Sequence, residues 1–206
     1  LSRRQRQMCI RDRKAAMREM MRDYLKNNDI STRGLMRYLK GLDFPTGGIV
    51  VNKDDLVKIY ESGTGKLRIR GRVEIEKLKG GRQQLVITEI PYTMIGANIG
   101  KFLNDIATLV ETKKTTDIVD ISNQSSKEGI RIVLDLKRDA DVENLTNMLY
   151  KKTKLEDTFG VNMLAVAEGR PETLGLVPII RHHVKFQYEL ATRKYQTLLK
   201  LSLIHI

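Results

Sequence analysis

The segment KLRIRGRVEIEK, from Lys66 to Lys77, alternates between charged and apolar residues with a period of two. Four of its cations fall on one side of the pattern: Lys66, Arg68, Arg70 and Arg72. Its apolar residues fall on the other side: Leu67, Ile69, Val73 and Ile75. Because successive side chains of a strand point to opposite faces, the segment predicts a strand over 66–78 whose apolar face packs on a core.

A second strand is predicted over 83–90, with Leu85 or Val86 meeting the apolar side of the first strand. The two glycines of the intervening segment KGGR favour a tight turn within Lys79–Arg82, so the two strands would form a hairpin. Pro91 has no amide hydrogen to donate and ends the pairing.

Helical spacing of apolar residues appears in six other segments, and it predicts helices over 14–28, 31–39, 54–62, 95–113, 141–152 and 178–200. Ser31 is suited to cap the second helix, and Gly63 to stop the third. Further strands are predicted at the end of 43–51 and over 117–122, 129–136 and 161–167. Strands and helices mixed without regular β-α-β alternation predict an α+β fold, with antiparallel hairpins flanked by helices.

The two ends of the chain carry an unusual relation. Under one choice of codons, the segments MCIRDR near the start and LSLIHI at the end are encoded by reverse-complementary DNA. We therefore expect residues 1–13 and 201–206 to be read-through of a sequencing adapter rather than native protein. A natural basic arm and an apolar tail are the alternative.

Removing these ends changes the composition. Cys9 falls within the first segment, which also holds five Arg and one Asp, so the remaining chain has no cysteine and its formal charge of +12 falls by four. It is still basic, which favours an anionic partner. The absence of cysteine gives no indication of disulfides, and no apolar run approaches the ~18 residues of a membrane span.

The row of cations allows two interpretations. A solvated outer face of a half-buried hairpin is the simpler one. The functional one is contact with nucleic-acid phosphates, because side chains at alternate positions recur about every 6.7 Å and the row would span about 20 Å. Phosphates along one DNA strand recur about every 3.4 Å of axis, so the row could follow a backbone. Such contacts supply affinity and position, without reading sequence.

Other candidate motifs are weak. The segment GTGK, Gly63 to Lys66, lacks the spacing of a phosphate-binding loop and precedes a predicted strand. His182 and His183 are neighbours on a predicted helix, so they point in different directions. Three carboxylates near the end of the predicted strand 129–136 lack calcium-loop spacing: Asp135, Asp139 and Asp141. No Ser/His/Asp or Cys/His set suggests a catalytic centre.

Five segments in this order and spacing resemble the breakage–reunion A subunit of bacterial type IIA topoisomerases, gyrase A or topoisomerase IV A: GLDFPTGGIV, YESGTGKLRIRGRVEIE, GGRQQLVITEIPY, GIRIVLDLKRDAD and NMLAVAEGRPETLGL. The resemblance covers nearly all of Lys14 to Lys200. Leu42 departs from the proline usual in the family, and the segment MIGANIGKF is less charged than its usual counterpart.

The resemblance implies that residues 14–171 form a tower domain and that residues 172–200 begin the coiled-coil arm toward the exit gate. It implies that Lys66, Arg68, Arg70 and Arg72 hold the arms of a bent gate duplex through backbone phosphates. It also implies that Val184, Tyr188, Leu198 and Leu199 of the last helix are exposed, because the return helix of the coiled coil is absent.

The same resemblance implies what the rest of the protein supplies. The nucleophilic tyrosine of the family lies upstream of Lys14, and Tyr38 only superficially echoes its motif, so the chain alone is expected to be inactive. Magnesium and ATP would bind the partner B subunit, and this chain would hold no cofactor or metal. The expected assembly is a cytoplasmic, ATP-dependent DNA topoisomerase of two A and two B subunits, with no membrane contact.

Two other classes of protein are alternatives. The same basic hairpin could belong to a stand-alone, non-sequence-specific DNA-binding module, or to a general RNA-binding domain. The order of the five segments argues against both. The sequence does not distinguish gyrase from topoisomerase IV.

Overall fold

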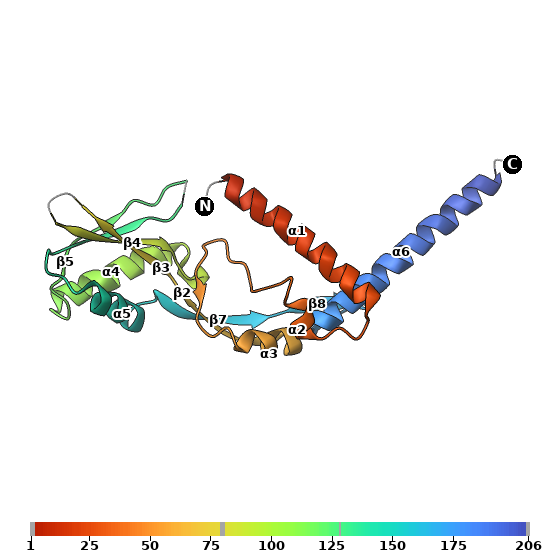
Figure 1. Cartoon of the computed structure of the whole chain (residues 1–206), viewed down its shortest axis with the longest axis horizontal. Coiled ribbons are helices and arrows are strands. Elements are labelled where there is room, and N and C mark those ends of the chain that lie inside the picture. The colour runs from red at the N-terminus through yellow and green to blue at the C-terminus, as the bar shows by residue number, and fades with distance from the viewer. Residues whose placement is uncertain (1–2, 79–80, 128, 205–206) are drawn as a thin grey trace. The chain divides into compact units, whose positions relative to one another are not determined.

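The computed structural model describes residues 3–78, 81–127 and 129–204; for residues 3–14, 97, 203 and 204 it describes the backbone alone. The helices are α1 (Arg3–Lys26), α2 (Thr32–Leu35), α3 (Asp55–Ser62), α4 (Ala97–Glu111), α5 (Val142–Lys152) and α6 (Leu176–Ile204), with a 3-10 turn, η1 (Tyr92–Met94). The strands are β1 (Ile49–Val50), β2 (Thr64–Arg70), β3 (Arg72–Lys77), β4 (Gln83–Glu89), β5 (Ile118–Asn123), β6 (Ile132–Leu136), β7 (Glu156–Asn162), β8 (Leu164–Ala167) and β9 (Arg170–Thr173). Figure 1 shows these mixed elements, and they confirm the α+β class.

The chain divides into two compact units. One unit contains residues 42–53 and 66–160 together with the beginning of α1. The other contains residues 11–41, 54–65 and 161–206. The predicted domain 14–171 is therefore shared between the two units, and its assignment as a tower stays a prediction.

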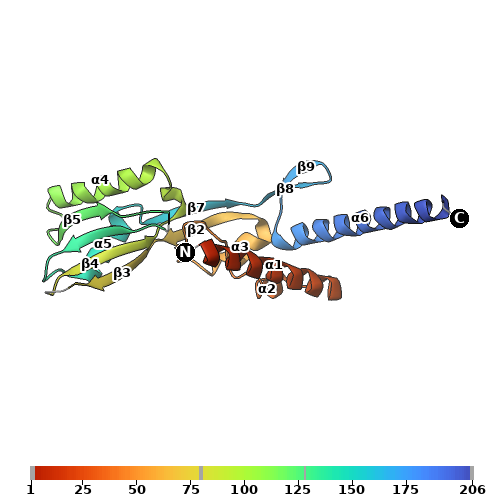
Figure 2. The same ribbon diagram turned by 90° about the horizontal axis from the view of Figure 1, so that it is seen from above.

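The first unit is built on an antiparallel sheet of four strands in the order β3-β4-β6-β5. Leu85 and Ile87 of β4 alternate with Val86, so they point to one face of this sheet. On that face they pack with Phe102 and Ile106 of α4 and with apolar residues of α5. Figure 2 shows both helices running beside the strands. One face of the sheet thus carries the helical layer and the core.

The predicted strand over 66–78 is two strands in two different sheets. β2 pairs with β1 in a three-stranded sheet of order β1-β2-β7, whereas β3 pairs with β4. The chain changes sheets at Gly71, whose amide donates to the carbonyl of Leu155 at 2.8 Å. A Cβ on Gly71 would lie 2.6 Å from a methyl of Leu155 and 2.7 Å from the carbonyl oxygen of Glu89. The prediction of one strand was wrong because this close approach ends it.

The apolar side of the predicted strand is buried along β2 and becomes exposed along β3. Leu67 and Ile69 are fully buried, and Val73 packs at the edge of the core, as predicted. Ile75 is 55% exposed, although its partner across the hairpin, Leu85, is buried. β3 is an edge strand, so a residue on it has a neighbouring strand on one side only. The prediction that Ile75 faces a core was wrong for this reason.

The predicted hairpin pairs β3 with β4, and the two strands end at Lys77 and begin at Gln83. The amide of Leu78 donates to the carbonyl of Arg82 at 2.8 Å, which closes the connection. This confirms a hairpin turn at the predicted place, although residues 79 and 80 lie outside the described residues.

The second unit packs helices against the start of α6. Ser31 caps α2 by accepting from the amide of Gly34, and α3 ends at Gly63 in the left-handed conformation, both as predicted. Gly175 allows α3 and α6 to approach, since a Cβ there would lie 2.2 Å from the carbonyl oxygen of Glu61. The apolar residues buried in this unit come from all four helices and from β7 and β8: Met20, Tyr24, Leu35, Leu56, Ile59, Tyr60, Val161, Ala167, Leu176 and Ile180.

The strand predicted over 161–167 is part of a longer system. β7 begins at Glu156 and β8 follows after Met163, whose amide donates to the carbonyl of Gly63 at 2.7 Å. β8 then pairs with β9 in a two-stranded ribbon. The bulk of β7 and the whole of β9 were missed, because residues 156–158 and β9 are almost entirely polar and only Phe159 and Val161 of β7 alternate.

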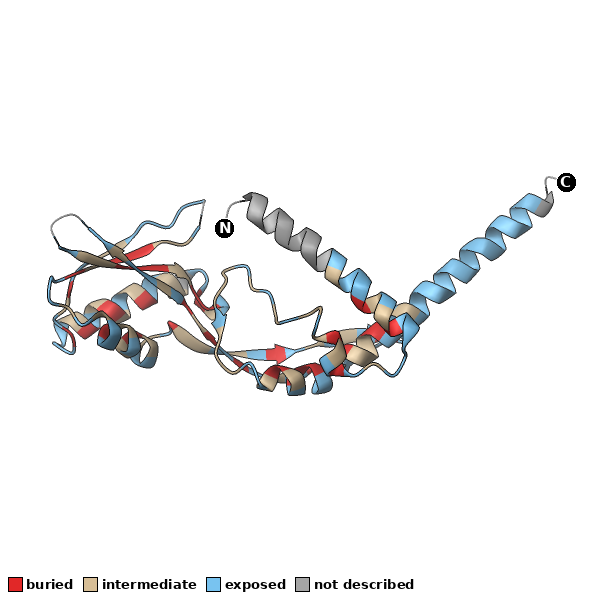
Figure 3. Cartoon of the chain, viewed as in Figure 1, coloured by how far each residue is buried: buried red, intermediate tan, exposed pale blue. Residues whose placement is uncertain are grey.

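The helix α6 is packed only over its first turns. Every residue from Lys185 to Ser202 is exposed, as the pale blue colour of this helix shows in Figure 3. The predicted exposure of Tyr188, Leu198 and Leu199 is confirmed. Val184 is half-buried, so the prediction was wrong for this residue, which lies nearer the packed turns.

The helices at both ends continue through the segments that we interpret as adapter. α1 begins at Arg3, and α6 continues through Leu201, which is exposed, to Ile204. The side chains of Met8, Cys9 and Ile10 lie outside the described residues. The adapter origin therefore stays a prediction.

Candidate nucleic-acid interface

Three of the four predicted phosphate contacts lie on β2, and the fourth lies beyond the break in the strand. Lys66 and Arg68 are exposed, Arg70 is half-buried, and Leu67 and Ile69 between them are buried. The alternation that the sequence predicts therefore holds as far as Arg70. Arg72 belongs to β3 and to the other sheet, so the four cations are not one continuous row along one strand.

The backbone of β2 is held along the edge that carries Lys66 and Arg68. The side chain of Asn52 accepts from the amide of Arg68 at 2.8 Å and donates to the carbonyl of Lys66 at 3.1 Å. The amide of Val51 donates to the carbonyl of Arg68 at 2.9 Å. Two exposed cations are thus presented from a rigid strand, which limits the entropy lost when they bind a ligand.

Arg70 is fixed by a carboxylate and an aromatic ring. Its Nε and Nη2 atoms lie 2.8 and 2.6 Å from Oε2 of Glu156, and its guanidinium carbon lies 4.3 Å from the centre of the Tyr150 ring. The hydroxyl of Tyr150 donates to the carbonyl of Gly71 at 3.0 Å, so the ring is itself held in place. Burial raises the pKa of Tyr150, which keeps this hydroxyl protonated. Arg70 therefore fastens β2 to the start of β7 more than it faces solvent.

Arg68 is held loosely by the same carboxylate. Its Nη1 atom lies 3.6 Å from Oε1 of Glu156, too far for a hydrogen bond, and its side chain is 56% exposed. Glu156 thus shares its two oxygens between two arginines and is itself 17% exposed. The guanidinium of Arg68 keeps most of its donors available for another acceptor.

Arg72 is engaged by a second carboxylate. Its Nε atom lies 3.3 Å from Oε1 of Glu89, and the other oxygen of Glu89 accepts from the amide of Gly48 at 2.6 Å. Gly47 lies against the same carboxylate, where a Cβ would approach it to 2.5 Å. The two glycines of the segment DFPTGG therefore both contact the carboxylate of Glu89. Arg72 supplies a positive charge beside this carboxylate.

The structure therefore separates the four cations into two groups. Arg70 and Arg72 each lie within 3.3 Å of a carboxylate oxygen, although Arg72 is still 51% exposed. Lys66 and Arg68 are exposed on β2, and Arg68 comes no nearer than 3.6 Å to a carboxylate. Among the described residues, Lys66 forms no ion pair. The sequence did not reveal the pairing of Arg70, because Glu156 lies 86 residues away. For Arg72, the only indication in the sequence was that its partner Glu89 lies in ITEIPY, one of the five segments that resemble the family.

A hollow of about 460 Å³ lies beside Arg68 and Arg70, between β2, the last turns of α5 and the start of β7. Besides these two arginines it is lined by Asn147, Tyr150, Lys151, Glu156, Asp157 and Thr158. Asp157 is occupied, since its carboxylate accepts from the hydroxyl of Thr93 at 2.7 Å and from the amide of Thr158 at 2.8 Å. No pattern in the sequence indicates that α5 would lie beside the cations of β2.

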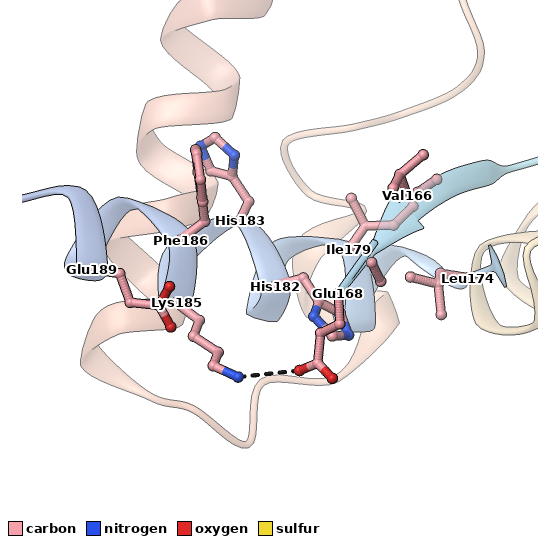
Figure 4. A pocket seen from close by; sticks show the side chains of 11 residues that line it. Val166, Glu168, Leu174, Ile179, His182, His183, Lys185, Phe186 and Glu189 are labelled. Atoms are coloured by element: carbon pink, nitrogen blue, oxygen red, sulfur yellow. Dashed lines mark hydrogen bonds and ion pairs between the residues drawn. The ribbon is translucent and has the colours of Figure 1, made fainter. Parts of the chain in front are cut away.

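A second hollow, of about 400 Å³, lies between α6 and the β8–β9 ribbon (Figure 4). It mixes apolar side chains such as Val166 and Phe186 with His182 and His183. In Figure 4 the two imidazoles point in different directions, as their adjacent positions on a helix require. Lys185 donates to Glu168 at 3.1 Å across its mouth. In the described part of the chain, no group of three or more His, Cys, Asp or Glu residues could hold a metal ion.

Tyr38, the superficial echo of a nucleophilic motif, has a structural role. Its hydroxyl donates a short hydrogen bond to the carboxylate of Asp23. This bond raises the pKa of Tyr38, with a smaller contribution from desolvation, so the hydroxyl stays protonated. A nucleophilic tyrosine needs the opposite shift.

The segment GTGK does not form a phosphate-binding loop. Gly63 ends α3, and the residues after it enter β2, so no helix N-terminus follows the glycines. The rejection of this motif from its spacing agrees with the structure.

Comparison with known proteins identifies the family. The family model for the A subunit of DNA gyrase/topoisomerase IV matches residues 15–203. The DNA gyrase A subunit of Clostridium acetobutylicum is 41% identical over 170 residues, which cover 82% of this chain and 20% of that protein. The DNA topoisomerase 4 A subunit of Staphylococcus epidermidis is 39% identical over 171 residues, covering 83% of this chain and 21% of that protein. The DNA gyrase A subunit of the same organism is 39% identical over 176 residues, covering 85% and 19%.

The α+β fold and these matches define the class of protein as an A subunit of the gyrase and topoisomerase IV type. The chain belongs to the family of DNA gyrase and topoisomerase IV A subunits, which confirms the resemblance seen in the five segments. It spans about a fifth of the length of the relatives it matches. Both gyrase and topoisomerase IV subunits match at similar identity, so the two are not distinguished. Within the described residues, no helix is both long and apolar enough to span a bilayer.

Proposed function

We propose that this chain is the part of a type II DNA topoisomerase A subunit that holds a DNA duplex through its backbone phosphates. The observation that carries this proposal is the pair Lys66 and Arg68, two exposed cations on one face of a strand whose backbone is fixed by Asn52. The two residues are two positions apart, about 6.7 Å along a strand, which is about the separation of alternate phosphates along the axis of one DNA strand.

The family membership supports DNA as the anionic partner. Phosphate contacts from lysine and arginine fix the position of a duplex and carry no sequence information. Bending a site of about 20–30 base pairs costs on the order of 1–6 kcal/mol, and additional backbone contacts offset that cost. A region that holds the arms of a bent duplex needs charge on rigid elements and no group that reads bases, which fits Lys66 and Arg68.

The rest of the activity is proposed to lie outside this chain. The relatives are about five times longer, so the tyrosine that cuts DNA is assigned to another part of the A subunit. Magnesium and ATP are assigned to a B subunit, and a second A subunit completes the enzyme, which would act on DNA in the cytoplasm. The tower and the coiled-coil arm remain our assignments for residues 14–171 and 172–200, and α6 with its exposed apolar residues supports the second.

The experiment is a salt-dependent titration of a mixed-sequence duplex with the 206-residue chain. The slope of log affinity against log salt is about −0.9 per phosphate contact, so Lys66→Ala with Arg68→Ala should reduce its magnitude by about 1.8. Both side chains are exposed, so each substitution should change the free energy of unfolding by less than about 0.5 kcal/mol. Sequence preference should not change, because neither residue reads bases.

The matched control is Arg193→Ala with Lys194→Ala, which removes the same charge from the exposed part of α6. It should leave the slope unchanged. Equal slopes for both double variants would assign binding to net charge alone, and a slope unchanged by Lys66→Ala with Arg68→Ala would make β2 a solvated face. A preference for duplex RNA over duplex DNA would favour the RNA-binding alternative.

A further inference from the structure

We propose that Lys151 and Asn147 of α5, together with Arg68 of β2, form a phosphodiester-binding hollow. Arg70, which Glu156 holds in place, lines one side of this hollow. This inference rests on the proposed function, since it names further contacts for the same DNA backbone. It concerns the hollow of about 460 Å³ that these residues line.

The position of Lys151 and Asn147 follows from the helical repeat. The two residues are four apart on α5, so their side chains lie one above the other on the same face of the helix. Both line the hollow, and Lys152, the next residue, does not. Lys151 is exposed and is in the last turn of α5.

The charges around the hollow leave room for an anion. Arg70 and Glu156 satisfy each other through two contacts of 2.6 and 2.8 Å, and Tyr150 covers one face of the guanidinium. Asp157 accepts hydrogen bonds from Thr93 and from a backbone amide, which are neutral, so it keeps its negative charge. The three cations and two carboxylates that line the hollow therefore leave one net positive charge. The cations whose charge is not matched by a hydrogen-bonded carboxylate are then Arg68 and Lys151, on opposite sides of the hollow.

The donors available in the hollow suit a phosphodiester. The guanidinium of Arg68 is 3.6 Å from Glu156, beyond hydrogen-bond range, so its N–H groups can donate to phosphate oxygens. Lys151 supplies a compact ammonium, and the amide of Asn147 supplies two neutral donors. The hydroxyl of Tyr150 is already used by Gly71, so it contributes the ring alone.

The arrangement also gives the DNA track a direction. Lys66 and Arg68 lie along β2. Arg68 and Lys151 both line the hollow, so the path of positive charge passes from β2 to α5. A backbone that passes Lys66 would therefore continue past Arg68 over the hollow. The predicted row of four cations is replaced by a shorter path through Lys66, Arg68 and Lys151.

The test compares Lys151→Ala with Lys152→Ala in the same duplex titration of the 206-residue chain. Each variant removes one charge from the same turn, and only Lys151 lines the hollow. Lys151→Ala should reduce the magnitude of the salt slope by about 0.9 and weaken binding about eightfold at ~0.1 M salt. Lys152→Ala should leave both unchanged, and Lys151→Arg should retain the slope because it keeps the charge.

A second pair of variants places a negative charge in the hollow and beside it. Asn147→Asp should weaken binding by a similar factor, about eightfold at ~0.1 M salt, because the new carboxylate repels a phosphate. Asn144→Asp on the same helix lines a different hollow and should have no effect. Thermal melting of each variant identifies any loss caused by unfolding, and Asn147→Asp, which keeps the size of the side chain, retains the test if Lys151→Ala is unstable.

The outcomes separate this inference from the proposed function. A wild-type chain that does not bind duplex DNA would overturn both. Normal binding that depends on Lys66 and Arg68 but is equal for Lys151→Ala and the wild type would overturn the hollow alone. Equal losses for Lys151→Ala and Lys152→Ala would also overturn it, because a general charge effect would then explain the result.

Discussion

Arg131 and Glu76 form a two-bond ion pair across an intervening strand. The Nη1 and Nη2 atoms of Arg131, which precedes β6, lie 2.9 and 2.7 Å from the two carboxylate oxygens of Glu76 on β3. The registers place Arg131 one residue before Ile132, the partner of Ile87, and place Glu76 opposite Gln84. The pair thus crosses β4 diagonally on the side of Val86, opposite the helical layer, and Val86 is fully buried.

Glu76→Gln should lower the melting temperature at neutral pH and lose this effect in acid. The hydrogen bond from Arg131 lowers the pKa of Glu76 below its ordinary value near 4.5. The folded pKa is the lower one, so the stabilisation is present above the unfolded pKa and is lost as the pH falls through the folded pKa. The measurement is thermal melting of both proteins between pH 7 and pH 3.

Because both side chains of this pair are about 40% exposed, the difference should be small and should shrink at high salt. Arg131→Met should have no additional effect in the Glu76→Gln background if the ion pair carries the stabilisation. A difference between wild type and Glu76→Gln that persists unchanged at pH 3 would show that packing, rather than charge, is responsible.

Gly71→Ala should destabilise the first unit by about 1–3 kcal/mol, the usual cost of forcing extra volume into a packed site. The new Cβ would meet Leu155 at 2.6 Å and the backbone oxygen of Glu89 at 2.7 Å. A side-chain methyl can move, but the backbone of β4 at Glu89 is held by its pairing with Arg72 of β3. Denaturant unfolding measures the change; an effect below about 0.5 kcal/mol would mean that the change of sheets at Gly71 tolerates a side chain.

Gly100→Ala should have the opposite sign. Gly100 lies within α4, is exposed, and has open space where a Cβ would be added. Alanine favours a helix interior over glycine by about 0.5–1 kcal/mol, chiefly because it restricts the unfolded chain. The same unfolding experiment should therefore show a stabilised protein. A destabilised Gly100→Ala would indicate that α4 needs the freedom of glycine at this position.

Local features of the fold could be predicted from the sequence. The alternation that buries Leu67 and Ile69, the cap at Ser31 and the stop at Gly63 depend on a few neighbouring residues, and each is where the pattern placed it. Gly71 was a signal in the sequence for the break between β2 and β3, since glycine inside a strand often marks a close backbone approach. The regular cations on both sides of it nevertheless favoured a continuous strand.

The candidate site could be predicted only in part, because its electrostatics depend on contacts between distant segments. Nothing near Arg70 indicates that Glu156 and Tyr150 would enclose it, since both lie on elements about 80 residues away in sequence. The exposure of Ile75 likewise depends on the order of strands in the sheet, which places β3 at the edge. Lys151 was predicted as part of a helix, and its position beside Arg68 is a property of the tertiary fold alone.

The exposed part of α6 should exchange its amide hydrogens much faster than α4, one face of which packs in the core. From Lys185 to Ser202 every residue is exposed, so these turns are stabilised by their own hydrogen bonds without tertiary packing. Isolated helices of this length are marginal in water, whereas Phe102 and Ile106 of α4 lie in the core. Hydrogen exchange followed by mass spectrometry should show residues 185–202 at least on the order of 100-fold less protected than α4.

The comparison should be repeated over a range of protein concentrations, because the exposed Tyr188, Leu198 and Leu199 could pair with another copy. Strong protection that persists at the lowest concentration would contradict an unpaired helix, and protection that appears only at high concentration would show that this surface associates.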